Sequence, residues 1–235
     1  MISVIMTAYN ADKYIREAIE SIINQTYKDW ELIVIDDCST DKTMNRIVSN
    51  HSDSNLISTI AMVENIGHTK CLNIALKQAK GDYIAWMDAD DISEPTRFEE
   101  QLKCFTGNVG IVTTHGIAIG KDGKRISDWY TDKAQRRCKL EIKINSPTSW
   151  WCMGPSMMFK REVVEKIGVF DEECYYAQDY NFWLRAIEYF DWEVCRMELY
   201  RLRRHKSVRS EPKAKERNWG ELARNRAKMA PIIKG

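Results

Sequence analysis

Two patterns of apolar side chains alternate along the first 90 residues. Short apolar runs rich in β-branched residues are typical of buried strands, and longer segments with apolar residues three and four positions apart are typical of amphipathic helices. The helical pattern is clearest in 11–25, where the apolar positions are Tyr14, Ile15, Ala18, Ile19, Ile22 and Ile23. The two patterns predict strands at 3–9, 31–37, 56–63 and 82–87 that alternate with helices at 11–25, 39–48 and 68–79.

Helix-end signals support this division. Ser39 or Thr40 is expected to cap the second helix, with Asp41 in its first turn. Gly81 is expected in the C-terminal cap of the third helix, where glycine is the favoured residue. Alternating strands and helices are joined by right-handed crossovers, so the segment predicts a mostly parallel sheet flanked by helices.

The second half of the chain is less regular. Residues 125–150 show little periodicity and predict a loop or lid. The fold class expected for the whole is α/β, a single Rossmann-like domain with a basic, helical C-terminal tail. The elements predicted here are a helix at 95–105 with Pro95 in its first turn, a strand at 110–120, a tight turn at 121–124, a strand and a short helix within 150–168, a helix at 177–190 beginning near Asp179, and a terminal strand pair at 192–202.

Polar side chains gather where the first four predicted strands end. In a parallel sheet these carboxyl ends meet at one edge, which is where ligands bind. The four groups are therefore expected to face one crevice. They are Thr7 to Asn10, Asp36 and Asp37, Glu64 and Asn65, and Asp88 to Asp91.

The fourth group contains a D-x-D pattern at Asp88, Ala89 and Asp90. Alternation along an extended chain points both carboxylates to the same side, where they can bind a hard cation such as Mg²⁺ or Mn²⁺, and the cation can bind a diphosphate. The structural alternative is that these residues only hold the turn into the next helix. Because Asp91 adds a third charge, repulsion raises the carboxylate pKa values unless a cation or hydrogen-bond donors compensate.

Other candidate residues each have a structural alternative. Of Asp36 and Asp37, one is expected to cap the following helix and the other to accept a hydrogen bond from a ligand such as a nucleobase. Lys70 either contacts a phosphate or is solvated. Asp179 suits a general base acting on a hydroxyl, or a local helix cap. His205, within a dense basic run, is a phosphate contact, a metal ligand or a solvated histidine.

Two tryptophans and the cysteines complete the candidates. Trp150 and Trp151, beside the irregular stretch, form either a platform for a sugar or part of the core. The seven cysteines are scattered singly without a C-x-x-C pair, which argues against a zinc ribbon or a disulfide scaffold and favours a reducing cytosol.

Composition is that of a soluble globular protein, with 44% apolar and 29% charged residues among 235. No apolar run of about 18 residues predicts a membrane span, and the start lacks the pattern of a signal peptide. Residues 201–235 hold twelve Lys or Arg and three Glu, a local charge of +9, which leaves −8 for residues 1–200 of a chain whose formal charge is +1. Such a tail can contact an anionic lipid surface, nucleic acid or a phosphorylated substrate, or be simply solvated.

Three blocks of sequence resemble glycosyltransferase family 2, whose members are inverting nucleotide-sugar transferases with the GT-A fold. They begin at "VIMTAYN", "NIGHTKCLNIAL" and "GPSMMFKREVV", and they include "ELIVIDDCSTD", "YIAWMDADDISEP" and "QDYNFWLRA". The resemblance covers residues 1–207. It implies a nucleotide-sugar-binding half at 1–107, an acceptor-binding half at 108–207 and a basic tail at 208–235.

Carried over by position, the resemblance implies a role for each matching residue. Asp179 would be the catalytic base, and the metal, Mn²⁺ or Mg²⁺, would be bound by Asp90 with His205 as a second ligand. Trp151 and Gln178 are the acceptor-side candidates. The residues expected to bind the nucleotide sugar are Thr7, Ala8, Tyr9, Asp37, Lys70, Asp88 and Ala89.

The family also implies the partners. The donor is expected to be a UDP-sugar, and the acceptor a glycan, a glycoprotein or a lipid-linked acceptor. We expect a cytoplasmic protein, with peripheral membrane contact through the tail and no nucleic-acid partner. Leu72 and Trp86 stand where relatives often carry arginine, and Gln178 stands where a glutamate is common, so Lys70 is expected to supply the missing positive charge.

Three other functions are weighed against the pattern. A non-catalytic nucleotide-sugar-binding module would use the same pocket. A nucleotidyltransferase would need a glycine-rich phosphate loop after the first strand, which "TAYNADKY" lacks, and a hydrolase with a nucleophilic aspartate would carry D-x-D after its first strand.

Overall fold

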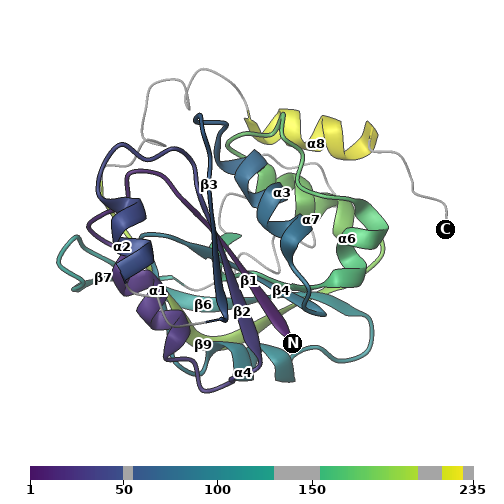
Figure 1. Ribbon diagram of the computed structural model, residues 1–235. Helices are drawn as coiled ribbons and strands as arrows, with labels where there is room; N and C mark the ends of the chain where they lie inside the picture. The colour runs from purple at the N-terminus through teal and green to yellow at the C-terminus, as the bar shows by residue number, and fades with distance from the viewer. Residues whose placement is uncertain (50–54, 130–153, 206–218, 230–235) are drawn as a thin grey trace.

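The computed structural model describes residues 1–49, 55–129, 154–205 and 219–229, which form one nine-stranded sheet with helices on both faces (Figure 1). The strands follow one another across the sheet in the order β3-β2-β1-β4-β8-β6-β9-β5, and β7 pairs with β6. The strands are β1 Ile2–Ala8, β2 Trp30–Asp36, β3 Ile57–Ala61, β4 Tyr83–Asp88, β5 Ile92–Ser93, β6 Val109–Ile119, β7 Arg125–Trp129, β8 Met158–Lys160 and β9 Asp191–Arg203.

The first four strands are parallel, as the alternation of strand and helix predicts. β1 pairs with β2 on one side and β4 on the other, and β2 pairs with β3. This register brings Ala8 opposite Asp36 and Thr7 opposite Asp88. The carboxyl ends of β1, β2 and β4 therefore lie level with one another at one edge of the sheet.

The other strands are mixed in direction. β8 is antiparallel to both β4 and β6, β9 is parallel to β6, and β5 and β7 are antiparallel additions. The sheet thus runs without a break from the predicted nucleotide-sugar half into the predicted acceptor half.

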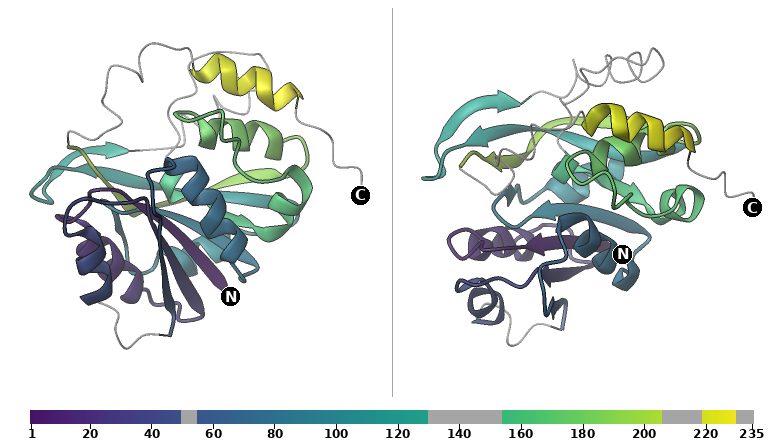
Figure 2. Two further views of the ribbon diagram at one scale, coloured as in Figure 1. Left: turned by 45° about the horizontal axis from the view of Figure 1, so that its top comes forward. Right: turned by 90° about the horizontal axis from the view of Figure 1, so that it is seen from above.

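Alternate side chains of the strands form two cores, one on each face of the sheet. Ile5 and Trp86 point to the face covered by α3 His68–Gln78, α6 Arg161–Ile167 and α7 Gln178–Ala186. Val4 and Met6 point to the opposite face, which α1 Ile15–Ile23, α2 Thr43–Ser49 and α4 Arg97–Lys103 cover. Figure 2 shows the helices on both sides of the sheet.

A last helix, α8 Trp219–Met229, belongs to the predicted basic tail and packs on α7, as both views of Figure 2 show. Ala223 is buried there and its carbonyl accepts a 3.0 Å hydrogen bond from Nδ2 of Asn181. Nε of Arg226 also lies 2.6 Å from a carboxylate oxygen of Asp171. Among the described helices, none has both the length and the apolar character needed to cross a membrane.

Several sequence predictions are wrong in detail. Helix α2 begins at Thr43, so Ser39 and Thr40 do not cap it and Asp41 lies before its first turn. The predicted strand pair at 192–202 is one long strand, β9, and part of the predicted loop, 125–129, is strand β7. The helix expected from Pro95 begins at Arg97, and Pro95 lies in the turn before it. The cap of α3 is Ala79 and not Gly81.

Gly81 has a different reason to be glycine. A Cβ at this position would lie 2.6 Å from the backbone N of Ser3 and 2.7 Å from the carbonyl oxygen of Met1. The backbone N–H of Gly81 donates to Oγ of Ser3 over 2.7 Å. A side chain would therefore separate the start of β4 from the start of β1.

Candidate functional site

A cavity of about 900 Å³ opens at the carboxyl ends of β1, β2 and β4. Its floor is the turn after β4, and its walls include the loop after β1, the end of β9 and the segment before α7. Members of all four groups expected at the strand ends line it, although Asp36 and Glu64 do not. Eight of the predicted site residues line this cavity together, namely Thr7, Ala8, Tyr9, Asp37, Asp88, Ala89, Asp90 and His205.

Three carboxylates meet on the cavity floor. One oxygen from each of Asp88, Asp90 and Asp91 lies within 4.8 Å of the other two. Asp91 is only 1% exposed. Burial raises its pKa well above the usual range, and the negative charges of Asp90 and Asp88 raise it further. The cluster thus favours either a bound proton or a bound cation.

Arg203, near the end of β9, holds the turn that carries these aspartates. Its backbone N–H donates to Oδ1 of Asp91 over 2.7 Å, and its Nε donates to the carbonyl oxygen of Asp90 over 2.8 Å. Nη2 forms an ion pair of 2.6 Å with Glu17, and the guanidinium lies 4.6 Å from the ring centroid of Tyr14. The buried Arg203 side chain thus links the backbone of the acidic turn to Glu17 in α1.

His205 lies directly against the acidic cluster. Its Nε2 is 2.6 Å from Oδ2 of Asp90, and its ring lies 5.0 Å from that of Tyr14, centroid to centroid. Three carboxylates with an adjacent imidazole form a donor set of the oxygen and nitrogen atoms that Mn²⁺ and Mg²⁺ accept. The residues present therefore fit a divalent cation.

Asp37 shapes the side of the cavity at the end of β2. Its two carboxylate oxygens accept hydrogen bonds from the backbone N–H groups of Ile66 and Gly67, over 2.7 and 3.0 Å. Neighbouring Asp36 accepts from Ser39 within its own turn, so it is the structural member of the pair. Asp37 is 4% exposed and lines the cavity. Because each carboxylate oxygen has two lone pairs, it can accept a further hydrogen bond from a ligand.

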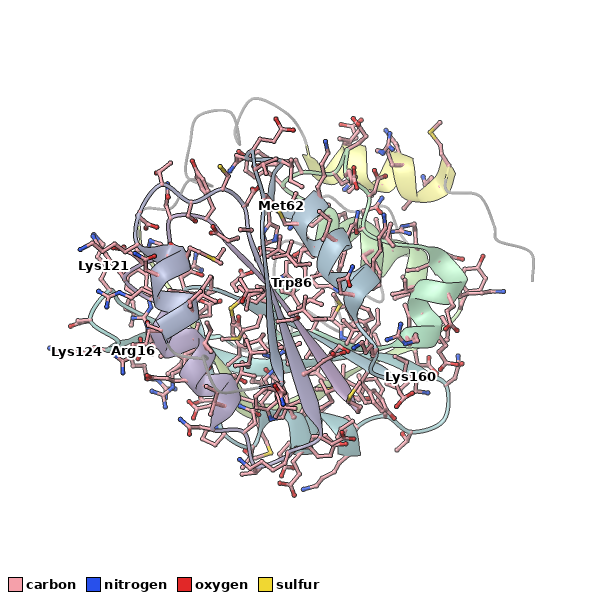
Figure 3. All side chains as sticks on the ribbon, in the orientation of Figure 1. Arg16, Met62, Trp86, Lys121, Lys124 and Lys160 are labelled. Carbon is pink, nitrogen blue, oxygen red and sulfur yellow. The ribbon has the colours of Figure 1, made fainter. Side chains whose placement is uncertain are left out.

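A row of polar contacts that the sequence did not predict runs from the cavity wall into the interior. Oγ1 of Thr7 lies 2.7 Å from Nδ1 of His68, the first residue of α3. The His68 ring lies 5.6 Å from that of Trp86, which is 1% exposed and lies in the interior of the molecule (Figure 3). Nε1 of Trp86 donates to Oδ1 of Asp88 over 3.0 Å, so the indole orients the first carboxylate of the D-x-D pattern.

A buried cation and a buried phenol lie next to this row. Arg97 is fully buried, and desolvation lowers its pKa to about 10. Its guanidinium lies 5.0 Å from the ring centroid of Tyr200, whose hydroxyl oxygen accepts a hydrogen bond from the backbone N–H of Asp88. Burial, followed by the charges of Asp91 and Asp88, raises the pKa of Tyr200 well above its usual range. Tyr200 is therefore neutral beneath the carboxylates.

The other predicted site residues are not among the described residues that line the cavity. Asp179 is half-buried in the first turn of α7, which follows the cavity-lining Tyr175 and Tyr176. Gln178 is 2% exposed, and Lys70 is exposed on α3. Trp150 and Trp151 fall outside the described residues.

Some of these contacts had a signal in the sequence. Trp86 precedes Asp88 by two positions, so strand alternation places both side chains on one face. Arg203 lay in the basic run near His205, but its partners at 17, 90 and 91 are distant in the chain.

Comparison with known proteins gives the same family on several grounds. The family model described as Glycosyl transferase family 2 matches residues 3–168. A glycosyltransferase of Methanocaldococcus jannaschii is 34% identical over 191 residues, covering 80% of this chain and 64% of the relative. One from Rickettsia typhi is 32% identical over 202 residues, covering 83% and 62%. Both relatives are named as uncharacterised, and the chain spans less than two thirds of either.

Solved structures show a similar fold. TarS from S. aureus in complex with UDP has a TM-score of 0.67 and 22% sequence identity, covering 86% of this chain and 60% of TarS. The mannosyltransferase PcManGT from Pyrobaculum calidifontis, in complex with GDP-Man and Mn²⁺, has a TM-score of 0.60 and 22% identity, covering 83% and 56%. With the family match over 3–168 and the acidic cavity at the strand ends, the chain belongs to glycosyl transferase family 2.

Proposed function

We propose that this chain transfers a sugar from a nucleotide-sugar donor, a UDP-sugar, to an acceptor hydroxyl with inversion at the anomeric carbon. The observation that carries the proposal is the cavity at the carboxyl ends of β1, β2 and β4, where Asp88, Asp90 and Asp91 meet. Family membership, and the titles of two structures of this fold that name UDP and GDP-Man, support a nucleotide sugar as the ligand.

The nucleotide is proposed to lie along the side of the cavity formed by β1 and β2. Thr7, Ala8 and Tyr9 would line the base pocket, and Asp37 would accept a hydrogen bond from the base. Asp88, oriented by the Trp86 indole, would accept from the ribose hydroxyls. Each of these four residues and Asp88 lines the cavity.

The diphosphate is proposed to lie over the acidic turn. Asp90 and His205 would hold a divalent cation there, because their ligand atoms are already adjacent and Arg203 fixes the backbone that carries Asp90. When bound, such a cation stabilises the charge that develops on the departing nucleoside diphosphate.

Asp179 is proposed as the general base. It would accept the proton of the acceptor hydroxyl as that oxygen attacks the anomeric carbon from the side opposite the leaving group. The position of Asp179 in the first turn of α7, three residues after the cavity-lining Tyr176, supports this role. One displacement inverts the configuration, so no nucleophilic serine or cysteine is required.

The first test is release of nucleoside diphosphate from a panel of nucleotide sugars with Mn²⁺, Mg²⁺ or EDTA. We expect turnover of one donor class, dependent on the metal. In Asp90→Ala, the metal should no longer tighten UDP binding. Asp29→Asn is the control, because Asp29 precedes β2 and so lies at the opposite edge of the sheet.

The second test separates an enzyme from a binding module. Asp179→Asn should keep the UDP dissociation constant and lower the transfer rate by at least about 100-fold, the usual contribution of a general base. Full transfer by this variant would refute the assigned base. Binding of UDP and metal by the unaltered chain, without consumption of any donor in any acceptor mixture, would favour the non-catalytic module.

A further inference from the structure

A short segment, residues 154–157, contacts both β4, the strand that carries the start of the D-x-D pattern, and α7, the helix that carries the proposed base. The backbone N–H of Trp86, two residues before Asp88, donates to the carbonyl oxygen of Met157 over 2.9 Å. On the other side, Nε1 of Trp183 in α7 lies 3.0 Å from the sulfur of Met157. This bridging segment therefore contacts β4 and α7 at the same residue.

Two buried side chains of α4 hold the bridging segment in place. Nη2 of Arg97 lies 3.3 Å from the carbonyl oxygen of Pro155 and 3.0 Å from that of Trp86. Nε2 of Gln101 donates to the carbonyl oxygen of Ser156 over 2.9 Å. Both side chains are 0% exposed. Buried donors that serve consecutive carbonyl groups leave the segment little freedom to shift relative to β4.

The first residue of the bridging segment faces Asp179. A Cβ added to Gly154 would lie 2.6 Å from Oδ2 of Asp179, 3.2 Å from its Cβ and 3.3 Å from its Cγ. Rotating the carboxylate about its Cβ–Cγ bond would relieve only the contact with Oδ2, because the contacts with Cβ and Cγ do not change in that rotation. A side chain at this position would therefore require either Asp179 or the segment to shift, and the buried donors of α4 hold the segment.

We propose that Gly154 is a positioning residue for Asp179. Its missing side chain lets the carboxylate lie against the bridging segment, whose bonds to β4 and α4 then fix the distance between Asp179 and the D-x-D aspartates. This inference rests on the proposed function, because it assumes that Asp179 is the base.

The test is Gly154→Ala, measured in transfer and in binding. The methyl group should lower kcat by about 10- to 100-fold, the range expected when a reacting group moves by about 1 Å. The KM for the donor and the dissociation constant of UDP with Mn²⁺ should stay within about twofold of the unaltered protein, because the nucleotide pocket is built from other residues. A role in folding alone would not produce this separation of kcat from binding.

Gly107→Ala is the matched control. Gly107 lies in the turn before β6 with φ of 54° and no atom within 4 Å of an added Cβ, so the substitution costs stability without meeting Asp179. Its kcat should be unchanged. If Asp179→Asn abolishes transfer while Gly154→Ala keeps its kcat, the positioning role is refuted and the base stands. If Asp179→Asn keeps full transfer, the proposed base itself is wrong.

The double variant Gly154→Ala/Asp179→Ala gives a readout that does not depend on activity. Asp179→Ala removes the contacts with Oδ2 and Cγ, the first of which is the shortest, and keeps only the 3.2 Å contact with Cβ. The double variant should therefore recover most of the melting temperature lost in Gly154→Ala, including the case in which the single variant does not fold. If the melting temperature of the double variant falls by the sum of the falls in the two single variants, the side chains at 154 and 179 do not contact each other, and the inference is overturned.

Discussion

Arg203 offers a sharp test of how the acidic turn is held. Its guanidinium donates most closely to two backbone carbonyl groups, of Asp90 over 2.8 Å and of Gly120 over 3.2 Å, with a longer contact of 3.4 Å to that of Lys121, and it forms an ion pair with Glu17. The Arg203 side chain is 2% exposed, whereas that of Glu17 is 54% exposed. Arg203→Met removes all of these interactions but keeps the backbone N–H that donates to Asp91.

The expected loss in the free energy of unfolding of Arg203→Met depends on how exposed each partner of the guanidinium is. Hydrogen bonds with a charged partner contribute about 1.5–3 kcal/mol each, and the two bonds to carbonyl groups are the ones shielded from water. Removing the guanidinium also removes the cost of burying it, so we take the lower end of that range and expect about 2–4 kcal/mol in total. For a domain of this size that corresponds to a fall in melting temperature of about 5–15 °C.

Glu17→Gln separates the ion pair from the carbonyl contacts. Because Glu17 is exposed, this variant should lose less than about 1 kcal/mol. Urea unfolding of the three proteins with equal m-values gives the comparison, and titration of UDP with Mn²⁺ should show weaker binding only in Arg203→Met. If Glu17→Gln costs as much stability as Arg203→Met, the acidic turn is not held by the two carbonyl contacts.

Two further predictions concern the aspartates themselves. Trp86→Phe keeps an aromatic ring but removes the N–H that donates to Asp88, so the dissociation constant of UDP with Mn²⁺, measured by calorimetry, should rise about tenfold; an unchanged value would exclude an orienting role. The raised pKa of Asp91 means that this carboxyl binds its proton more tightly in the folded state than in the unfolded state. Asp91 therefore destabilises the metal-free protein increasingly as the pH rises from the pKa of the unfolded state, near 4, through the higher pKa of the folded state. In EDTA, the melting temperature of Asp91→Asn relative to the unaltered protein should therefore increase between pH 5 and 8, and a difference independent of pH would contradict the assignment.

The parallel part of the fold was predictable because its signals are local. Each of the first strands is followed by its own helix, and period and spacing identify both without knowledge of distant contacts. β9 was harder to predict, since it pairs with β6 over most of its length although some 80 residues separate them, and bulges interrupt the register. Gly81 fits a local cap signal, but the close approach of Ser3 and Met1 is what requires a glycine.

The same distinction applies to the site. The carboxylates could be predicted because parallel strands bring their carboxyl ends to one edge, and that rule needs only the order of strands. The groups that support them could not, because the bond between Arg203 and Asp90 joins residues 113 positions apart. Trp86 is the exception, since its distance of two residues from Asp88 was already visible in the sequence.

The crowding of the three aspartates becomes intelligible once each one's partner is known. Asp88 accepts from the Trp86 indole, Asp90 contacts His205, and Asp91 accepts from the backbone of Arg203. Two unit charges 4.8 Å apart repel by about 3.5 kcal/mol at an effective dielectric constant of 20. One hydrogen bond contributes about 1.5–3 kcal/mol even with a charged partner, so single donors do not offset the repulsion among three anions. Without a cation, the raised pKa of Asp91, the most buried of the three carboxyl groups, favours its protonated form and so lowers the repulsion within the cluster. A bound divalent cation would instead stabilise all three carboxylates in their ionised form, because it would offset the repulsion that the hydrogen-bond donors do not.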